Sequence, residues 1–163
     1  MKLYGVTGWK NSGKTHLMER LVTEITGRGL TVSTIKHAHH SAETDREGTD
    51  SYRHRVAGAQ EVILASPTRW ALMHELRGAA EPSLDELVDR LGHVDLVLVE
   101  GYKSAPHPKI EAHRTATRKG LIAKDNPTIR AVASDGAPET DLPVQHLDDT
   151  AGIADFILAE LGF

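Results

Sequence analysis

The sequence predicts an α/β fold of three layers, built on a mostly parallel, partly mixed sheet. Three observations support this class. Short β-branched and aliphatic runs alternate along the chain with segments of helical periodicity, which is typical of βαβ units. A glycine-rich loop stands between the first such run and the first helical segment. The run Leu96–Val99 is apolar throughout, as expected of a strand that is buried on both faces.

The first 36 residues predict a strand, a loop, a helix and a second strand. The first strand is Leu3–Thr7. Apolar residues then recur at helical spacing, at Leu17, Leu21, Val22 and Ile25. Gly27 and Gly29 are typical of a helix end, and the β-branched run Leu30–Lys36 predicts the next strand.

The middle of the chain is more polar. Residues 37–55 are rich in His, Asp and Arg, and we expect a long loop there, which in a compact domain is usually functional or disordered. Two short strands are expected at Glu61–Ala65 and Trp70–Met73, on either side of a Ser66–Thr68 turn.

A capped helix and two weaker strands are expected in the remainder. Ser83 has the position of an N-cap, and Glu86 three residues later completes a capping box for a helix that extends to Leu91. The other expected elements are strands at Lys109–His113 and Ile129–Ala133 and a closing helix at Thr150–Leu161. We find no repeat and no linker, so we expect a single domain over residues 1–163.

The glycine-rich loop carries the strongest functional signal. It matches the complete G-x-x-x-x-G-K-[ST] pattern with Gly8, Trp9, Lys10, Asn11, Ser12, Gly13, Lys14 and Thr15. In such a loop the backbone N–H groups, here including that of His16, hold phosphates, the lysine reaches the β- and γ-phosphates, and the hydroxyl binds Mg²⁺. The alternative is a glycine turn beside a surface lysine. That alternative does not account for the strand expected before the loop and the helix expected after it. We therefore expect nucleoside triphosphate binding and a P-loop NTPase fold.

Glu100 follows the buried run Leu96–Val99 directly. Ligands of doubly wound sheets bind at the carboxyl ends of the strands, so Glu100 is expected near the phosphate loop. There it would hold the magnesium shell or position the attacking water, which makes Lys14 and Glu100 the candidate catalytic residues and Thr15 and Glu100 the candidate metal ligands. The alternative is a glutamate that faces solvent at the end of a strand.

The polar segment contains a histidine cluster. His37, His39 and His40 could bind zinc or nickel, or they could donate hydrogen bonds to an anionic substrate. Asp50 and Arg53 are further candidates for a substrate or partner loop, against the alternative of solvated surface charges.

Composition excludes several classes of protein. The chain has 163 residues, no cysteine and 4% aromatic residues, so thiolate metal sites are excluded and a stacking platform for single-stranded nucleic acid is disfavoured. Residues 1–60 carry nine Lys and Arg against six Asp and Glu, and residues 61–163 carry ten against seventeen. The positive part contains the phosphate loop, but the excess is too small to indicate nucleic-acid binding. No apolar run is long enough for a membrane span and no signal peptide is recognisable, so we expect a cytoplasmic protein.

Several segments together resemble one family. They are Gly8–Thr15, Thr34–His40, Gly48–Arg55, Ala57–Ala59, Asp95–Tyr102 and Pro108–Glu111. Their order and spacing are similar to those of the molybdopterin-guanine dinucleotide biosynthesis protein B (MobB) family, over about residues 2–135. The resemblance implies a GTP-binding protein with at most slow GTPase activity and bound Mg²⁺, usually homodimeric, which assists the guanylyltransferase that joins GMP to molybdopterin.

Carried over by position, the resemblance assigns residues 8–16 to the phosphates, and Thr15 and Glu100 to magnesium. It places the blocks around His37–His40 and Asp50–Arg55 beside the nucleotide or the pterin-phosphate partner. The chain lacks an N-K-x-D motif for guanine. Asp135 follows an expected strand and could accept hydrogen bonds from guanine N1 and N2, or it is a simple turn residue before Gly136.

Two other functions remain open from the sequence. A metallochaperone GTPase would use the histidine cluster. A small-molecule kinase would need a lid with basic residues, and the segment 114–130 offers Arg114, Arg118, Lys119 and Lys124. The short strands around 61–73 and 109–113 are candidates for pairing between subunits.

Overall fold

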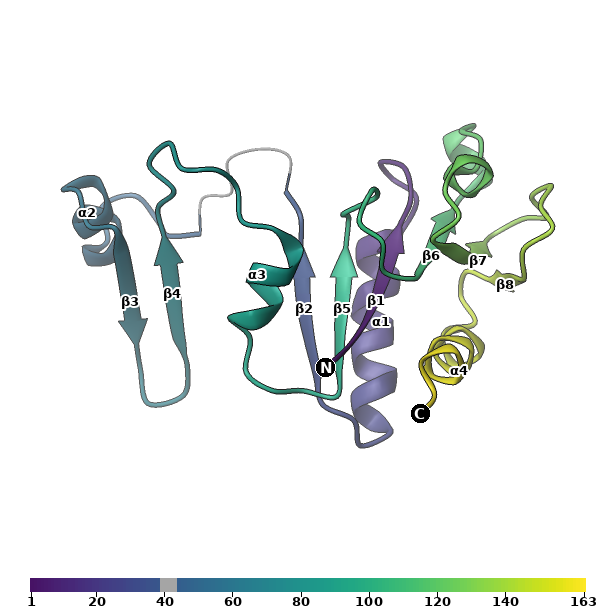
Figure 1. Cartoon of the computed structure of the whole chain (residues 1–163), viewed down its shortest axis with the longest axis horizontal. Coiled ribbons are helices and arrows are strands. Elements are labelled where there is room, and N and C mark those ends of the chain that lie inside the picture. The colour runs from purple at the N-terminus through teal and green to yellow at the C-terminus, as the bar shows by residue number, and fades with distance from the viewer. Residues whose placement is uncertain (39–43) are drawn as a thin grey trace. The chain divides into compact units, whose positions relative to one another are not determined.

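The chain forms two compact units (Figure 1). The first joins residues 1–37 to residues 84–163, and the second comprises residues 38–83. The structure, a computed structural model, describes residues 1–38 and 44–163. The expected single domain over residues 1–163 stays a prediction.

The first unit is built on a six-stranded sheet with the order β2-β5-β1-β6-β7-β8. Every pairing in this sheet is parallel, and an antiparallel pairing lies in a separate hairpin. The strands are β1 (Lys2–Thr7), β2 (Val32–Lys36), β5 (Leu96–Glu100), β6 (Lys109–His113), β7 (Ile129–Ser134) and β8 (Val144–His146). The expected α/β class with a mostly parallel sheet is confirmed.

Strand β1 lies inside the sheet, with β5 on one side and β6 on the other. Gly5 is opposite Val99 in the first pair and opposite Lys109 in the second. Because the three strands run in one direction, the chain leaves all of them at the same edge, where the phosphate loop begins. Strand β6 also pairs with β7. The expectation that residues 109–113 pair between subunits is therefore wrong, because both edges of that strand are occupied.

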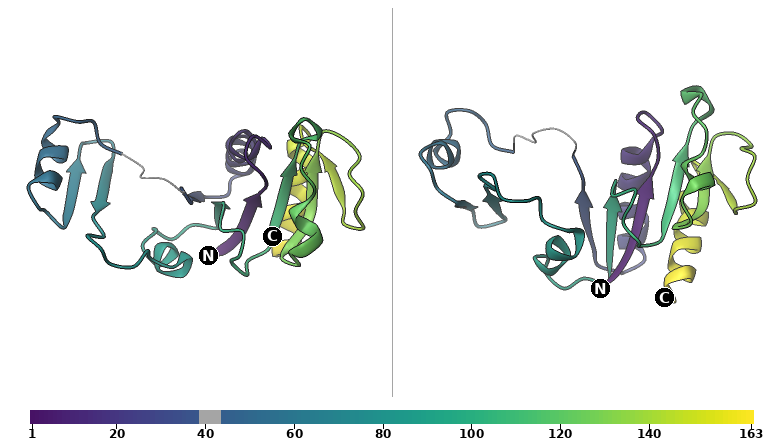
Figure 2. Two further views of the ribbon diagram at one scale, coloured as in Figure 1. Left: turned by 90° about the horizontal axis from the view of Figure 1, so that it is seen from above. Right: turned by 45° about the horizontal axis from the view of Figure 1, so that its top comes forward.

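Helices cover both faces of this sheet and complete the three layers (Figure 2). They are α1 (Lys14–Gly27) and α4 (Thr150–Leu161) on one face and α3 (Leu84–Asp89) on the other, with two short 3₁₀ turns, η1 (Thr115–Thr117) and η2 (Ile122–Asp125), after β6. Alternate residues of β5 divide between the faces: Leu98 packs with α1 and α4, whereas Val97 and Val99 pack with α3.

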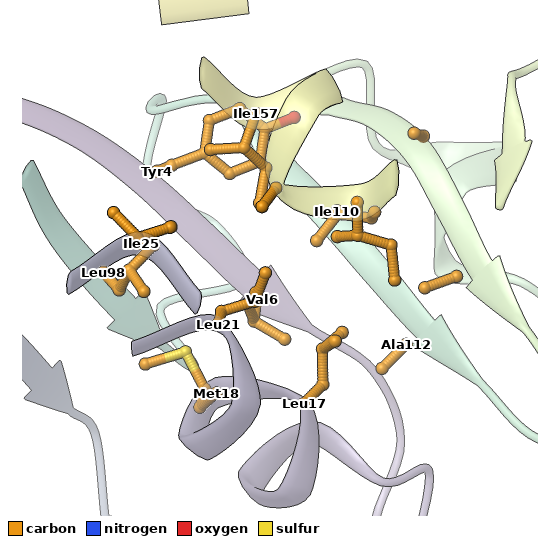
Figure 3. Packing of buried hydrophobic residues seen from close by; sticks show 14 of the residues in the cluster. Tyr4, Val6, Leu17, Met18, Leu21, Ile25, Leu98, Ile110, Ala112 and Ile157 are labelled. Carbon is orange, nitrogen blue, oxygen red and sulfur yellow. The ribbon is translucent and has the colours of Figure 1, made fainter. Parts of the chain in front are cut away.

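The larger core lies between the sheet and α1 with α4. Leu17, Leu21 and Ile25 are four residues apart, so they form one stripe along α1 that is fully buried. Figure 3 shows this stripe against side chains of β1, β5, β6 and α4, among them Tyr4, Val6, Leu98, Ile110 and Ile157. This packing fixes the start of α1, and hence the phosphate loop, on the end of β1.

The second unit consists of a short helix and an antiparallel hairpin, with the bounds α2 (Asp50–Val56), β3 (Glu61–Ala65) and β4 (Trp70–His74). Helix α2 packs on β3, and the Arg55 guanidinium pairs with Asp45 at 2.8 Å and with Glu75 at 3.6 Å. The expected strands of the hairpin are confirmed, but part of the expected loop 37–55 is helical.

None of the helices within residues 1–38 and 44–163 combines the length and the apolar character that crossing a membrane requires.

Candidate functional site

The phosphate loop connects β1 to α1 at the carboxyl edge of the sheet. Gly8 and Gly13 have φ of +144° and +89°, a region that L side chains rarely adopt. At Gly8 a Cβ would also lie 2.3 Å from the carbonyl oxygen of Ala112. Gly13 is the N-cap residue of α1, so the first N–H groups of the helix have no partner within the helix. Both glycines of the motif are thus required by the path of the backbone.

A cavity of about 460 Å³ lies at this loop. It is lined by Asn11, Ser12, Gly13, Lys14, Thr15, His16 and Arg114. The free N–H groups and the positive end of the helix dipole favour an anion at such a place. The Ser12 side chain is buried, and its hydroxyl has no hydrogen-bond partner among the described residues. Of the loop residues named from the sequence, Asn11 to His16 therefore meet at one cavity that is suited to a phosphate.

Lys14 lies over its own loop. Its Nζ donates a hydrogen bond to the carbonyl oxygen of Trp9 at 2.7 Å. Burial lowers the pKa of this ammonium group, and the carboxylate of Glu100 opposes the shift, while the charges of Lys103 and Lys36 add to it. An anion in the cavity would offset the cost of burying this charge.

Glu100, at the end of β5, is 8% exposed and contacts the phosphate loop directly. The Thr15 hydroxyl donates to Glu100 Oε1 at 3.1 Å, and Lys36 Nζ lies 3.5 Å from the same oxygen. Because the hydroxyl hydrogen is used in this contact, the lone pairs of Thr15 Oγ1 stay available to a cation. Hydroxyl and carboxylate oxygens are ligands that Mg²⁺ prefers. The two residues named from the sequence are together, and their oxygens suit magnesium.

Trp9 connects the phosphate loop to two other loops at this edge. Its indole N–H donates to the carbonyl oxygen of Gly120 at 2.7 Å, and Lys103 Nζ lies 4.5 Å from the centre of its ring. The second contact has the geometry of a cation–π interaction. Lys10 and His16 are exposed. The loop is thus held by the segments that follow β5 and β6.

Arg114 was considered from the sequence only as part of a kinase lid, with Arg118, Lys119 and Lys124. Of these four residues, Arg114 alone lines the cavity. The sequence gives one signal for it, because it directly follows a strand that ends at the ligand-binding edge. That signal needs the position of β6 beside β1, which is not visible in the chain order.

Asp135 directly follows β7 and is exposed at the same edge. Its Oδ1 accepts a hydrogen bond from the backbone N–H of Thr115 at 2.8 Å. This bond holds the pKa of the carboxyl below its usual value, and the Arg114 charge contributes to that shift. Asp135 therefore anchors the start of η1, next to the residue that lines the cavity.

The residues named for a substrate or partner loop are divided. The His37 ring lies 4.7 Å from that of Tyr102, and its backbone N–H donates to the carbonyl oxygen of Glu100 at 2.9 Å, so His37 belongs to the edge of the sheet. Asp50 lines a cavity of about 480 Å³ in the second unit, and Arg53 is exposed on α2. His39 and His40 lie outside the described residues.

In the part of the chain that the structure describes, no three His, Cys, Asp or Glu side chains gather as a metal site. The transition-metal site expected of His37, His39 and His40 stays a prediction, because His39 and His40 lie outside the described residues.

Comparison with known proteins gives one consistent result. Residues 3–135 match the family model described as MobB, molybdopterin guanine dinucleotide synthesis protein B. A protein of Haemophilus influenzae named molybdopterin-guanine dinucleotide biosynthesis adapter protein is 43% identical over 157 residues, which covers 95% of this chain and 86% of that protein. The protein of the same name from Escherichia coli is 38% identical over 160 residues, which covers 96% of this chain and 91% of that protein.

Solved structures agree with this result. A crystal structure described as molybdopterin-guanine biosynthesis protein B superposes with a TM-score of 0.76 at 26% identity and covers 97% of this chain and 99% of that chain. The crystal structure of Bacillus subtilis MobB superposes with a TM-score of 0.78 at 25% identity and covers 98% of both chains.

Proposed function

The chain belongs to the molybdopterin guanine dinucleotide synthesis protein B family, and from this premise we propose that it is a GTP-binding adapter in the conversion of molybdopterin to molybdopterin guanine dinucleotide. The observation that carries the proposal is the phosphate loop itself. The second half of the loop, Asn11–Thr15, lines a cavity at the N-terminus of α1, and the Glu100 carboxylate accepts a hydrogen bond from the Thr15 hydroxyl. A loop of this geometry suits a nucleoside triphosphate with Mg²⁺.

Nucleotide and metal take defined places in this proposal. The N–H groups of residues 8–16 hold the phosphates, and the Lys14 ammonium leaves the carbonyl of Trp9 for the β- and γ-phosphates. Thr15 and Glu100 hold Mg²⁺, which neutralises charge on the phosphates when bound. Asp135 is the candidate residue for recognising guanine. Its Oδ1 accepts a hydrogen bond from the Thr115 N–H, and a bound base would compete with that N–H for the same oxygen.

Catalysis in this proposal is slow. Lys14 stabilises negative charge on the phosphates, and Glu100 orders the metal shell. The adapter role requires bound GTP more than turnover, so GTP hydrolysis is expected to be at most a weak side activity. The partner is the guanylyltransferase that attaches GMP to molybdopterin, and the complex works in the cytoplasm.

We further propose that the protein is a homodimer through the hairpin of the second unit. Ile63 is opposite Leu72, and Ala65 is opposite Trp70, so the four residues share one face of the hairpin. Ile63 and Trp70 are 65% and 68% exposed, far more than is usual for side chains of this size. A second copy of the same face would cover them.

The first experiment is a calorimetric titration of the purified protein with Mg-GTP and, separately, with Mg-ATP. We expect binding with a preference for GTP, and we expect Lys14→Ala to abolish it while the circular dichroism spectrum stays unchanged. A Lys14→Ala variant that binds as tightly as the wild type would refute the assignment of the loop. Preference for ATP would instead favour a kinase.

Rate separates the kinase alternative, which Arg114 on the cavity wall favours, from the adapter. A kinase turns over at about 1–100 per second in the presence of its acceptor. We expect triphosphate hydrolysis by this protein to be far slower, with and without molybdopterin. The role in the pathway is tested in a strain that lacks the gene: activity of enzymes that need the guanylated cofactor should fall, and Lys14→Ala should not restore it.

A further inference from the structure

The Arg114 side chain lies beside the phosphate loop, and its charge also acts on the nearby carboxylate of Asp135. Its backbone is extended, with φ −127° and ψ 130°, and it follows β6 directly. Strand β6 flanks β1 on the side opposite to β5. Arg114 and Glu100 therefore approach the phosphate loop from two opposite sides.

The guanidinium group of Arg114 lies over Gly13, in the space that a side chain at this position would need. A Cβ built on Gly13 would lie 3.0 Å from Arg114 Nε, 3.5 Å from Nη2 and 3.6 Å from Cζ. Arg114 Nε is buried, yet it has no hydrogen-bond acceptor among the described residues. A buried donor without an acceptor costs free energy, and the cost is higher for a charged group. The burial of this N–H group is thus unfavourable in the protein alone.

The electrostatic setting adds to this cost. Gly13 caps the N-terminus of α1, a helix of 14 residues, and the dipole of a helix places positive potential there. A guanidinium group stays charged at any physiological pH, so Arg114 adds a cation where the helix already repels one. An anion in the adjoining cavity would reverse the sign of both effects, because it would accept hydrogen bonds from the guanidinium and from the helix.

We propose that Arg114 is a phosphate-binding side chain, whose guanidinium donates a hydrogen bond to the α- or β-phosphate of the nucleotide in the loop. This rests on the proposed function. The choice of phosphate follows from position. Backbone N–H groups of such a loop hold the α- and β-phosphates, whereas the lysine side chain reaches the β- and γ-phosphates. Arg114 lies over Gly13, away from the Thr15–Glu100 pair that would hold the metal.

This position makes a specific prediction for binding. The Arg114 contact needs neither the γ-phosphate nor Mg²⁺. Arg114→Gln should therefore weaken the binding of the nucleoside diphosphate and of the triphosphate by similar factors. A hydrogen bond to a charged group corresponds to a loss of about 10- to 100-fold in affinity. The same factor is expected in EDTA. Lys124→Gln is the matched control, because it removes one positive charge from the same segment at a residue that is exposed and does not line the cavity.

The test is a calorimetric titration of wild type, Arg114→Gln and Lys124→Gln with GDP and GTP, or with ADP and ATP if the wild type prefers adenine. Unchanged affinity in Arg114→Gln, or a loss of affinity confined to the triphosphate, overturns this inference. The proposed function is retained in that case if the wild type binds the nucleotide. Absence of binding by the wild type overturns both.

A thermal melt separates binding from a structural role. Without nucleotide, Arg114→Gln should unfold close to the wild-type temperature, because it removes a buried Nε without an acceptor and, besides that, only the charge attraction to the exposed carboxylate of Asp135. The rise of the melting temperature with nucleotide should be smaller than in the wild type. A variant that is destabilised without nucleotide and retains the full rise would show that Arg114 is structural.

Discussion

Two buried basic side chains stand at the start of β6, away from the phosphate loop. Lys109 is fully buried, and its Nζ donates to the carbonyl oxygen of His107 at 2.8 Å, to Thr128 Oγ1 at 2.9 Å and to the carbonyl oxygen of Ala105. The His107 ring is 8% exposed, and neither ring nitrogen has a partner among the described residues. The hydrogen-bonded Lys109 ammonium therefore lies close to an imidazole without hydrogen bonds. The hydrogen bonds of the first contribute to stability, whereas the unpaired nitrogens of the second reduce it.

The His107 ring makes folding sensitive to acid. Burial, assisted by the charge of Lys109, lowers the pKa of His107 from 6.5 to about 4. Between these two pKa values the unfolded chain binds more protons than the folded chain, so the free energy of unfolding falls as the pH drops from about 6.5 to about 4. Above about pH 6.5 the ring is neutral in both states, and no stability is lost. The loss amounts to at most about 3 kcal/mol. Urea unfolding of wild type and His107→Leu at pH 7, 5.5 and 4.5 measures it, and parallel profiles would contradict the prediction.

The Glu100 carboxylate should govern the effect of magnesium on nucleotide affinity. Glu100→Gln keeps the size of the side chain but removes the charge next to Thr15 Oγ1. We expect the gain in GTP affinity on adding Mg²⁺ to shrink by about 10- to 100-fold, with little change in EDTA. Glu160→Gln is the control, since that carboxylate bonds to Tyr4 in another part of the unit. An equal loss with and without the metal would show a direct role in phosphate binding.

At the scale of elements, β1 has room for no side chain at Gly5. A Cβ there would lie 2.6 Å from His107 Nε2 and 2.7 Å from Lys109 Cγ. We expect Gly5→Ala to lower the free energy of unfolding by about 1–3 kcal/mol through overpacking. Gly27 lies at the end of α1, and a Cβ built there would meet no other part of the protein within 4 Å. Gly27→Ala should therefore raise the free energy of unfolding by about 0.5–1 kcal/mol. Chemical denaturation of both variants provides the comparison, and a loss of stability in both would refute the packing explanation.

The elements that the sequence predicted well are those with a strong apolar period. The closing helix Thr150–Leu161 has the expected bounds, and the run Leu96–Val99 is fully buried as predicted. Helix α2 was missed because, of its seven residues, only Ser51 is buried, so no apolar stripe marks it. Strand β8 has three residues and none of them is buried, which leaves no pattern to detect.

The site follows the same division. The phosphate loop and Glu100 were predicted because each is marked locally, the first by its motif and the second by the apolar strand before it. Arg114 was not assigned to the phosphates because its place depends on the pairing of β6 with β1, over one hundred residues apart in the chain. The contact of Thr115 with Asp135 depends in the same way on the pairing of β6 with β7.

At the scale of the whole molecule, the two units differ in how they bury apolar surface. The first unit encloses its apolar residues between the sheet and three helices. In the hairpin of the second unit, Val62 is 8% exposed, but Ile63 on the opposite face is 65% exposed. A two-stranded hairpin is at best marginally stable alone in water. Association with a second copy would therefore stabilise this unit as well as join two chains.

The proposed homodimer is tested by placing charges on that face. We expect Ile63→Lys with Trp70→Lys to convert a dimer to a monomer in sedimentation velocity. Burial of each such side chain is worth about 1.5–3 kcal/mol, and each counts twice in a symmetric interface, so the dissociation constant should rise at least about ten-thousandfold. Val144→Lys is the control, because Val144 is 43% exposed on β8 of the first unit. A wild-type protein that sediments as a monomer at 100-fold dilution and at high concentration alike would contradict the dimer, and a double variant that stays dimeric would place the interface elsewhere on the chain.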